Sequence, residues 1–244
     1  MSGSWVLVIL ILISSLPVIA VYVWFKLAKY QFSLYWFLFA LLAGAAAFFP
    51  ALILQEMLIF TFRSGRAAMF FQYFVRIALT EELSRLLILI VFFWISARIS
   101  PNNKPLSING IKKAAATGLI AGLGFSLLET LRYAASDISI LPLRLILTAA
   151  VHAACGSRIG TAAVLLRSNP IQAFMRILTA TAIHGIYNLM LAMPGFSPIA
   201  AILIAISAFF TAIMTIRGGW SGDTANSSVT VQAAATLDKN GENS

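Results

Sequence analysis

The sequence predicts an all-α polytopic membrane protein, a helix bundle with about seven transmembrane helices. Three observations indicate this class. Of the 244 residues, 60% are apolar and 10% are charged, whereas a soluble domain is roughly 25% charged. Uncharged runs of membrane-spanning length lie towards both ends of the chain. The 17 basic residues outnumber the 8 acidic ones and gather mostly in segments that would connect helices. A water-soluble enzyme of ordinary composition is therefore excluded.

Four helices follow directly from uncharged runs. Trp5–Phe25 and Tyr30–Gln55 are each long enough to cross a bilayer, which needs about 20 apolar residues. Ile177–Ile216 is also uncharged, and the segment 193–198, with its Pro and Gly residues, divides it into two helices.

The middle of the chain yields three more helices only if ionisable residues lie inside them. Its uncharged stretches, residues 86–97, 114–128 and 145–157, are too short to span a bilayer. Spanning length requires that these residues enter the membrane: Glu81, Glu82, Arg85, Glu129, Arg132 and Arg158. Such groups are costly in lipid and by default indicate function. The predicted helices cover residues 5–25, 32–60, 78–98, 111–133, 142–166, 171–193 and 198–217.

The basic residues predict an orientation with the N-terminus outside and the C-terminus inside. This orientation places most of them on the cytoplasmic side: Lys26, Lys29, Arg98, Lys104, Lys112, Lys113, Arg167, Arg176 and Arg217. Arg63, Arg66 and Arg144 fall on the opposite side, and Arg76 falls near the membrane boundary. The net charge of +9 is thus an orientation signal, and no nucleic acid is expected as a partner.

The chain divides into a membrane domain, residues 1–217, and a polar tail, residues 218–244, which we expect to be disordered and cytoplasmic. The single cysteine, Cys155, excludes an internal disulfide framework and a Cys-based zinc cluster. The partner expected from composition is the lipid bilayer, whereas the oligomeric state is left open.

Six polar residues in the predicted helices are candidates for chemistry: Glu81, Glu82, Glu129, His152, His184 and Asn188. At 1.5 Å per residue, the three glutamates lie roughly 24–25 Å from the cytoplasmic boundary and the two histidines roughly 12–15 Å below the outer helix ends. These depths allow all of them to converge in one cavity. Helical spacing adds supporting residues on the same faces, namely Arg85, Phe125 and Tyr133.

Taken singly, each of these residues has a structural explanation, because buried histidines and Glu–Arg pairs often only hold helices together. Taken together, adjacent glutamates, a third glutamate and the only two histidines favour a functional site. Ala114, Gly118 and Gly122, by contrast, indicate a close-packing helix face and not a phosphate loop.

Carboxylates, imidazoles and an amide in a water-accessible membrane cavity suit hydrolysis. A glutamate would activate water, while imidazole and Asn N–H groups would hold the developing oxyanion. Alternatively, Glu129, His152 and His184 form a zinc-type ligand set, which leaves Glu81 or Glu82 as the base. Since no H-E-x-x-H motif is present, zinc and metal-free mechanisms both stay open. The alternative function is a non-enzymatic scaffold or a small-solute or proton transporter, although the repeated halves typical of transporters are not visible.

Four blocks in order resemble the PrsW family of intramembrane proteases, relatives of the type II CAAX prenyl endopeptidases. Residues 81–85 resemble E-E-x-x-K, with Arg85 in place of lysine. Residues 122–130 resemble G-x-G-F-A-x-x-E-N, with Thr130 in place of asparagine. His152 and Gly160 resemble the histidine block of the next helix, and residues 184–188 resemble H-G-x-x-N. The blocks span roughly Thr80–Leu191.

The resemblance implies a peptidase of the bacterial cytoplasmic membrane that cuts membrane-anchored proteins, in the best-known cases anti-sigma factors on the extracytoplasmic side. It implies that Glu81 and Glu82 are the catalytic carboxylates. His152, His184 and Asn188 would stabilise the tetrahedral intermediate, while Glu129 would shape the site or join the histidines on a metal. An inactive family member that acts as a chaperone or adaptor is a third possibility, which the complete residue set disfavours.

Overall fold

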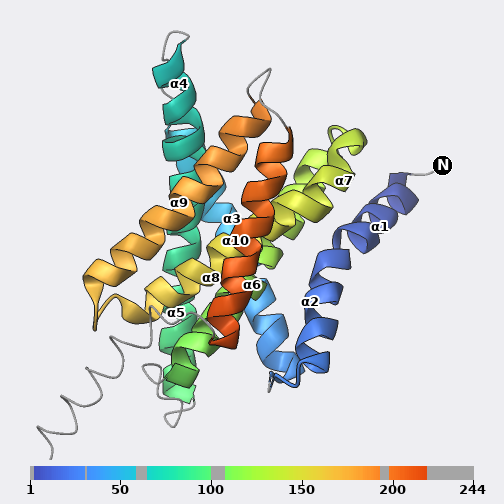
Figure 1. Ribbon diagram of the computed structural model, residues 1–244. Helices are drawn as coiled ribbons and strands as arrows, with labels where there is room; N and C mark the ends of the chain where they lie inside the picture. Colours follow the sequence, from blue (N-terminus) through green and yellow to red (C-terminus); the bar gives the residue numbers. More distant parts are fainter. Residues whose placement is uncertain (1–2, 31, 59–64, 100–107, 193–197, 219–244) are drawn as a thin grey trace, which may run out of the picture.

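The computed structural model describes residues 3–30, 32–58, 65–99, 108–192 and 198–218, and all regular structure within these ranges is helical. The helices (Figure 1) are α1 (Gly3–Ser14), α2 (Leu16–Leu27), α3 (Leu34–Met57), α4 (Arg66–Phe70), η1 (Phe71–Leu79), α5 (Thr80–Ile99), α6 (Ile108–Ala134), η2 (Ile138–Ile140), α7 (Leu141–Leu143), η3 (Arg144–Thr148), α8 (Ala149–Leu165), α9 (Pro170–Ala192) and α10 (Pro198–Arg217). Several of them adjoin end to end, so the described helices form about seven rods. The predicted all-α membrane bundle is confirmed.

Five helical segments of the described chain are long and apolar enough to cross a membrane: Val8–Leu27, Leu34–Met57, Gly110–Ser136, Ile138–Leu165 and Ile199–Arg217. The distribution of side chains is that of a membrane protein. Large apolar residues such as Phe39 and Ile146 are exposed, whereas the charged residues Glu82 and Arg85 are fully buried. A lipid environment explains this inversion, because lipid solvates apolar surface and charged groups must find partners inside the bundle.

The third rod differs from the sequence prediction at its start. It begins at Arg66, well before the predicted residue 78, and runs through α4 and the π-helix η1 into α5. Arg76, which the sequence placed near the membrane boundary, lies within the helix, where it donates hydrogen bonds to the Gln55 carbonyl and to Gln72. These partners occupy two of its three guanidinium nitrogens, and the helix continues past a residue that the sequence placed at its limit. The predicted tail lies outside the described residues, except for Gly218.

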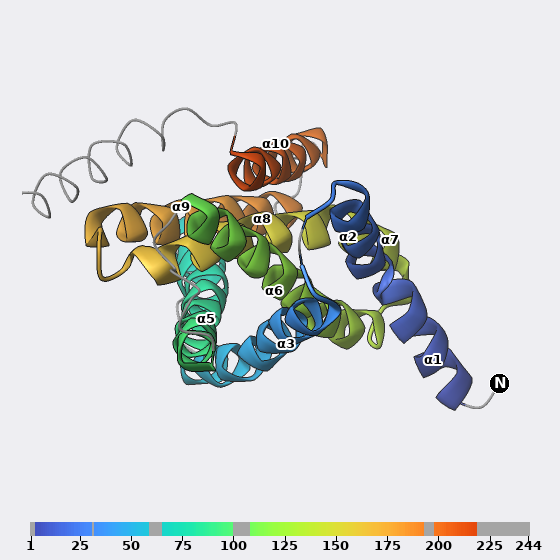
Figure 2. The same ribbon diagram turned by 90° about the horizontal axis from the view of Figure 1, so that it is seen from below.

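Helix α6 occupies the middle of the bundle, with α3 on one side and α8 on the other, as Figure 2 shows. Glycines permit both contacts. A Cβ atom on Gly122 would overlap the carbonyl group of His152 in α8, and one on Gly156 would overlap the carbonyl oxygen of Gly118. Towards α3, Gly44 lies equally close to the backbone of Ala121. The close-packing face predicted from sequence is therefore present, and it sets the distance between α6 and the helix that carries His152.

We expect Gly122→Ala to lower stability by about 1–3 kcal/mol, because the added methyl group forces α6 and α8 apart. The sign of this stability change is informative, since alanine otherwise stabilises a helix relative to glycine by about 1 kcal/mol. Thermal unfolding in detergent can be followed by labelling Cys155, which is fully buried in the folded chain. Ser207→Val, which adds bulk at an exposed position of α10, is the control. A stabilised Gly122→Ala variant would contradict the close-contact interpretation.

Candidate active site

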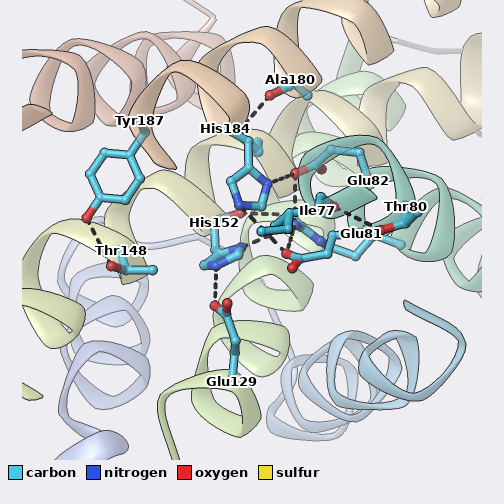
Figure 3. Close-up of polar contacts among 12 residues, drawn as sticks. Ile77, Thr80, Glu81, Glu82, Glu129, Thr148, His152, Ala180, His184 and Tyr187 are labelled. Atoms are coloured by element: carbon cyan, nitrogen blue, oxygen red, sulfur yellow. Dashed lines mark hydrogen bonds and ion pairs between the residues drawn. The ribbon is translucent and has the colours of Figure 1, made fainter. Parts of the chain in front are cut away.

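The two adjacent glutamates lie in the first turn of α5, directly after the π-helix η1. Arg85, one turn further along, compensates Glu82: its Nη2 atom is 2.8 Å from Glu82 Oε1, and both side chains are fully buried. The same nitrogen is 3.8 Å from Glu81 Oε2. Spacings of three and four residues place all three side chains on one helix face. A single helical turn thus supplies two carboxylates and one cation (Figure 3 shows the glutamates).

His184 of α9 packs against this turn. Its Nδ1 atom lies 2.8 Å from Glu82 Oε1, and its Nε2 atom lies 3.7 Å from Glu81 Oε2. Because Glu82 is paired with a guanidinium and accepts hydrogen bonds, Nδ1 of His184 is the donor. The other ring nitrogen, Nε2, therefore faces Glu81.

His152, near the start of α8, lies on the other side of the cluster (Figure 3). Arg85 Nη2 is 3.2 Å from His152 Nδ1, and this ring atom must accept because a guanidinium only donates. The ring proton then resides on Nε2, which donates to Glu129 Oε2 over 2.7 Å. His152 is consequently a neutral imidazole held between a cation and a carboxylate.

Glu129, near the end of α6, contacts His152 on the side of the ring away from Arg85. Its Oε2 atom also contacts the guanidinium of Arg144, which stacks on the Tyr133 ring with 4.3 Å to the ring centroid. The sequence placed Arg144 at the outer end of the predicted helix 142–166 without a role in the site, whereas it is the first residue of the π-helix η3 and contacts Glu129. The predicted supporting residue Tyr133 reaches the site through this arginine.

Phe125 supports the centre of the cluster. Its ring lies under the Arg85 guanidinium, 4.7 Å from centroid to Cζ, and 5.4 Å from the His152 ring. The two imidazole rings meet edge to face, with 4.8 Å between centroids. Arg85, Phe125 and the two histidines therefore pack as one unit.

Two carboxylate oxygens in the cluster are buried and accept no hydrogen bond from the described residues: Glu81 Oε2 and Glu82 Oε2. The other oxygen of Glu81 accepts from Gln55 Nε2 over 3.0 Å. The bonded cluster contains three carboxylates but only two guanidinium groups, Arg85 and Arg144. With neutral imidazoles it has an excess of negative charge, so it is suited to receive a proton or a cation.

Glu81, His152 and His184 could hold a metal ion, since each offers one ligand atom and these atoms lie within 4.8 Å of one another. The metal set expected from the sequence contained Glu129 in place of Glu81. In the structure Glu129 accepts a hydrogen bond from Nε2 of His152, and Glu82 accepts one from Nδ1 of His184, so each carboxylate holds the ring nitrogen that would not bind the metal. Carboxylates in this position orient histidine ligands in metal sites, so the residue types fit zinc. The ligand atom of His152 would be Nδ1, which in this structure accepts from Arg85 Nη2, so a metal would replace that hydrogen bond.

A polar cavity of about 150 Å³ opens onto the cluster between α3, η1, α5 and α6. Glu81 and Glu129 line it, although they are only 3% and 8% exposed, and so do Gln72 and Arg76. This volume holds several water molecules, each of which needs about 30 Å³ in the liquid. Water can therefore reach two of the three glutamates.

Five of the six candidates from sequence lie together: Glu81, Glu82, Glu129, His152 and His184. The sixth, Asn188, is half-buried one turn beyond His184, and no hydrogen bond found in the described residues joins it to the cluster. Instead the neighbouring Tyr187 is buried and its hydroxyl pairs with Thr148, 2.9 Å away. Tyr187, Gln55 and Arg144 were missed. Of these three, only Arg144 could have been recognised from the sequence, because it is a cation eight residues before a candidate histidine.

We expect Arg85→Met to destabilise the protein by about 3–5 kcal/mol, because Glu82 would stay buried without its cation. Combining it with Glu82→Leu should recover part of this loss, since both charges are then gone. Thermal unfolding of the purified variants measures both effects. Arg98→Met, at an exposed arginine of the same helix, should change stability by no more than about 0.5 kcal/mol. Additive effects of the two site substitutions would show that the pair does not couple.

Comparison with known protein families matches residues 33–215 to the model described as PrsW family intramembrane metalloprotease. The match covers most of the chain and includes every residue of the cluster. No curated protein and no solved structure matches the chain.

Proposed function

Because the chain belongs to the PrsW family of intramembrane metalloproteases, we propose that the Glu–His cluster hydrolyses peptide bonds of membrane-anchored proteins. Family membership supports a membrane protease over the scaffold or transporter considered from sequence. One observation carries the assignment of the reaction centre. Glu81 Oε2 is buried, accepts no hydrogen bond from the described residues and faces His184 Nε2 beside a polar cavity.

The proposed reaction begins with a water molecule in this cavity. Glu81 is the carboxylate that takes its proton, and Gln55 fixes the second oxygen of Glu81 so that Oε2 points to the centre. Glu82 orients His184 and is itself held by Arg85. His184, once protonated, donates from Nε2 and, together with Asn188, stabilises the oxyanion of the tetrahedral intermediate. His152 has its only N–H on Glu129, so it positions Glu129 and Arg85. The proton on Glu81 then goes to the leaving amine.

A divalent metal, which the family description implies, would be held by Glu81, His152 and His184. It would supply a Lewis acid that polarises the scissile carbonyl and acidifies water. Glu81 would then be a ligand, and Glu129, the other glutamate that lines the cavity, would be left to accept the proton. Arg144 holds Glu129 in place for this role.

The position of the cluster along its helices supports a choice of substrate class. The cluster lies at the ends opposite Arg98 of α5 and Lys113 of α6, so in the predicted orientation with the N-terminus outside it would face the extracytoplasmic half of the bacterial membrane. Single-span proteins of the anti-sigma-factor type present peptide bonds at that depth. We therefore propose such proteins as substrates, cut near the outer end of their membrane segment.

Glu81→Gln and His184→Ala should each reduce cleavage of a single-span reporter at least about 100-fold, because each removes a group at the reaction centre. Cleavage is measured on purified protein in vesicles, alongside protein levels and thermal stability. Asp137→Asn, at an exposed acidic residue between α6 and η2, should cleave normally. Full activity of a Glu81→Gln/Glu82→Gln double variant would refute the assignment.

Chelation tests the metal. Treating the purified protein with a zinc chelator should abolish cleavage, and added zinc should restore it. The metal content, measured by elemental analysis, should fall in Glu81→Gln and His152→Ala but stay unchanged in Asp137→Asn. Cleavage that is indifferent to chelation, with no bound metal, would leave Glu81 as the base of a metal-free reaction.

A further inference from the structure

A second polar cavity lies between α8, α9 and α10, on the C-terminal half of α8, which the proposed reaction does not use. Its volume is about 310 Å³, and its walls include Arg158, Arg176 and five hydroxyl side chains. Arg158 is one of the residues that the sequence places inside a membrane helix. No acidic residue lines this cavity.

The charge of Arg158 is compensated only by neutral groups among the described residues. Its Nη1 atom donates to the carbonyl oxygens of Ala154 and Ala208, at 2.9 and 3.4 Å, and its Nη2 atom donates to the Thr211 hydroxyl. A guanidinium has five N–H donors, so these bonds leave donors for a further ligand. Because a cation inside a membrane normally pairs with an anion, a negatively charged ligand would complete this site.

The cavity lies close to one end of the bundle, where the helix ends would meet one membrane face. Arg176 is six residues from the start of α9 and Thr211 is six residues from the end of α10, so each is roughly 9 Å inside its helix end. Long arginine side chains reach further outwards. Thr179 in the cavity wall is exposed on the outer surface of the bundle, so the site communicates with the bilayer. The same face carries Lys113 and other basic residues, which is typical of the side that meets anionic headgroups.

We propose that this cavity binds the phosphate group of an anionic phospholipid from the leaflet at the basic face. Two guanidinium groups in one cavity match phosphate, since arginine binds its oxygens through pairs of N–H donors. Hydroxyl groups in the same walls add neutral donors of the same kind. Basic pockets between transmembrane helices bind phospholipid headgroups through these interactions. A free phosphate ion has the same chemistry, but a lipid also places its acyl chains against the exposed apolar face of α9.

Lipid binding to the purified full chain in neutral detergent tests the proposal. Native mass spectrometry would measure the affinity for phosphatidylglycerol, for phosphatidylcholine with the same acyl chains, and for inorganic phosphate. We expect phosphatidylglycerol to bind at least about tenfold more tightly than phosphatidylcholine. Arg158→Gln should weaken this binding at least about tenfold, because it removes charge-assisted hydrogen bonds. Arg176→Gln should act in the same direction and serves as the second variant if Arg158→Gln does not fold.

Arg167→Gln removes the same charge from an exposed position at the same membrane face and is the matched control. It should leave the affinity for phosphatidylglycerol unchanged within about twofold. Inorganic phosphate that binds as tightly as phosphatidylglycerol would support phosphate recognition and make a soluble ion its source. Equal affinity for the two lipids, or unchanged phosphatidylglycerol binding in both arginine variants, would overturn the proposal.

Discussion

The architecture of the site depends on the compensation of charge around Arg85. This guanidinium is fully buried and contacts Glu82 on its own helix and His152 on α8. Glu82 in turn holds His184 of α9, and His152 holds Glu129 of α6. Four helices are therefore joined through one cation. Arg85, Glu82 and the two histidines do not line the polar cavity and cannot exchange their partners for water, so the helices must keep the positions in which these groups are paired.

This polar network works only because the backbones approach so closely. Glycines on facing sides of α6 and α8 remove the side chains that would otherwise separate the helices. Gly122 lies directly against the carbonyl group of His152, so one of the close backbone contacts is made at the histidine of the cluster. Small residues thus give the bundle its geometry, and the ionisable residues give it a function. Close packing alone would not be sufficient, because without each other Arg85 and Glu82 would be buried as uncompensated charges.

Much of this arrangement could be predicted from the sequence, for identifiable physical reasons. Hydropathy and charge predicted the helices. The position of each residue along its helix predicted that Glu81, Glu129, His152 and His184 lie at a similar depth in the membrane. Helical spacing does not determine which side chains from different helices touch. For this reason the grouping of Glu81 with the two histidines, in place of Glu129, needed the three-dimensional structure. Arg144 was not predicted for a related reason, since its charge was interpreted only as an orientation signal, and its contact with Glu129 is visible only in the structure.

The π-helix η1 changes which side chains of the third rod point towards the interior of the bundle. In a regular α-helix, positions five residues apart point about 140° away from each other, whereas a π-helical turn brings them back towards the same side. Arg76 and Glu81 are five residues apart and line the same cavity. The wider turn therefore rotates the directions of the side chains of the rod just before α5. The segment before η1 and the helix α5 after it can therefore direct different sets of positions towards the interior of the bundle, although they form one continuous rod.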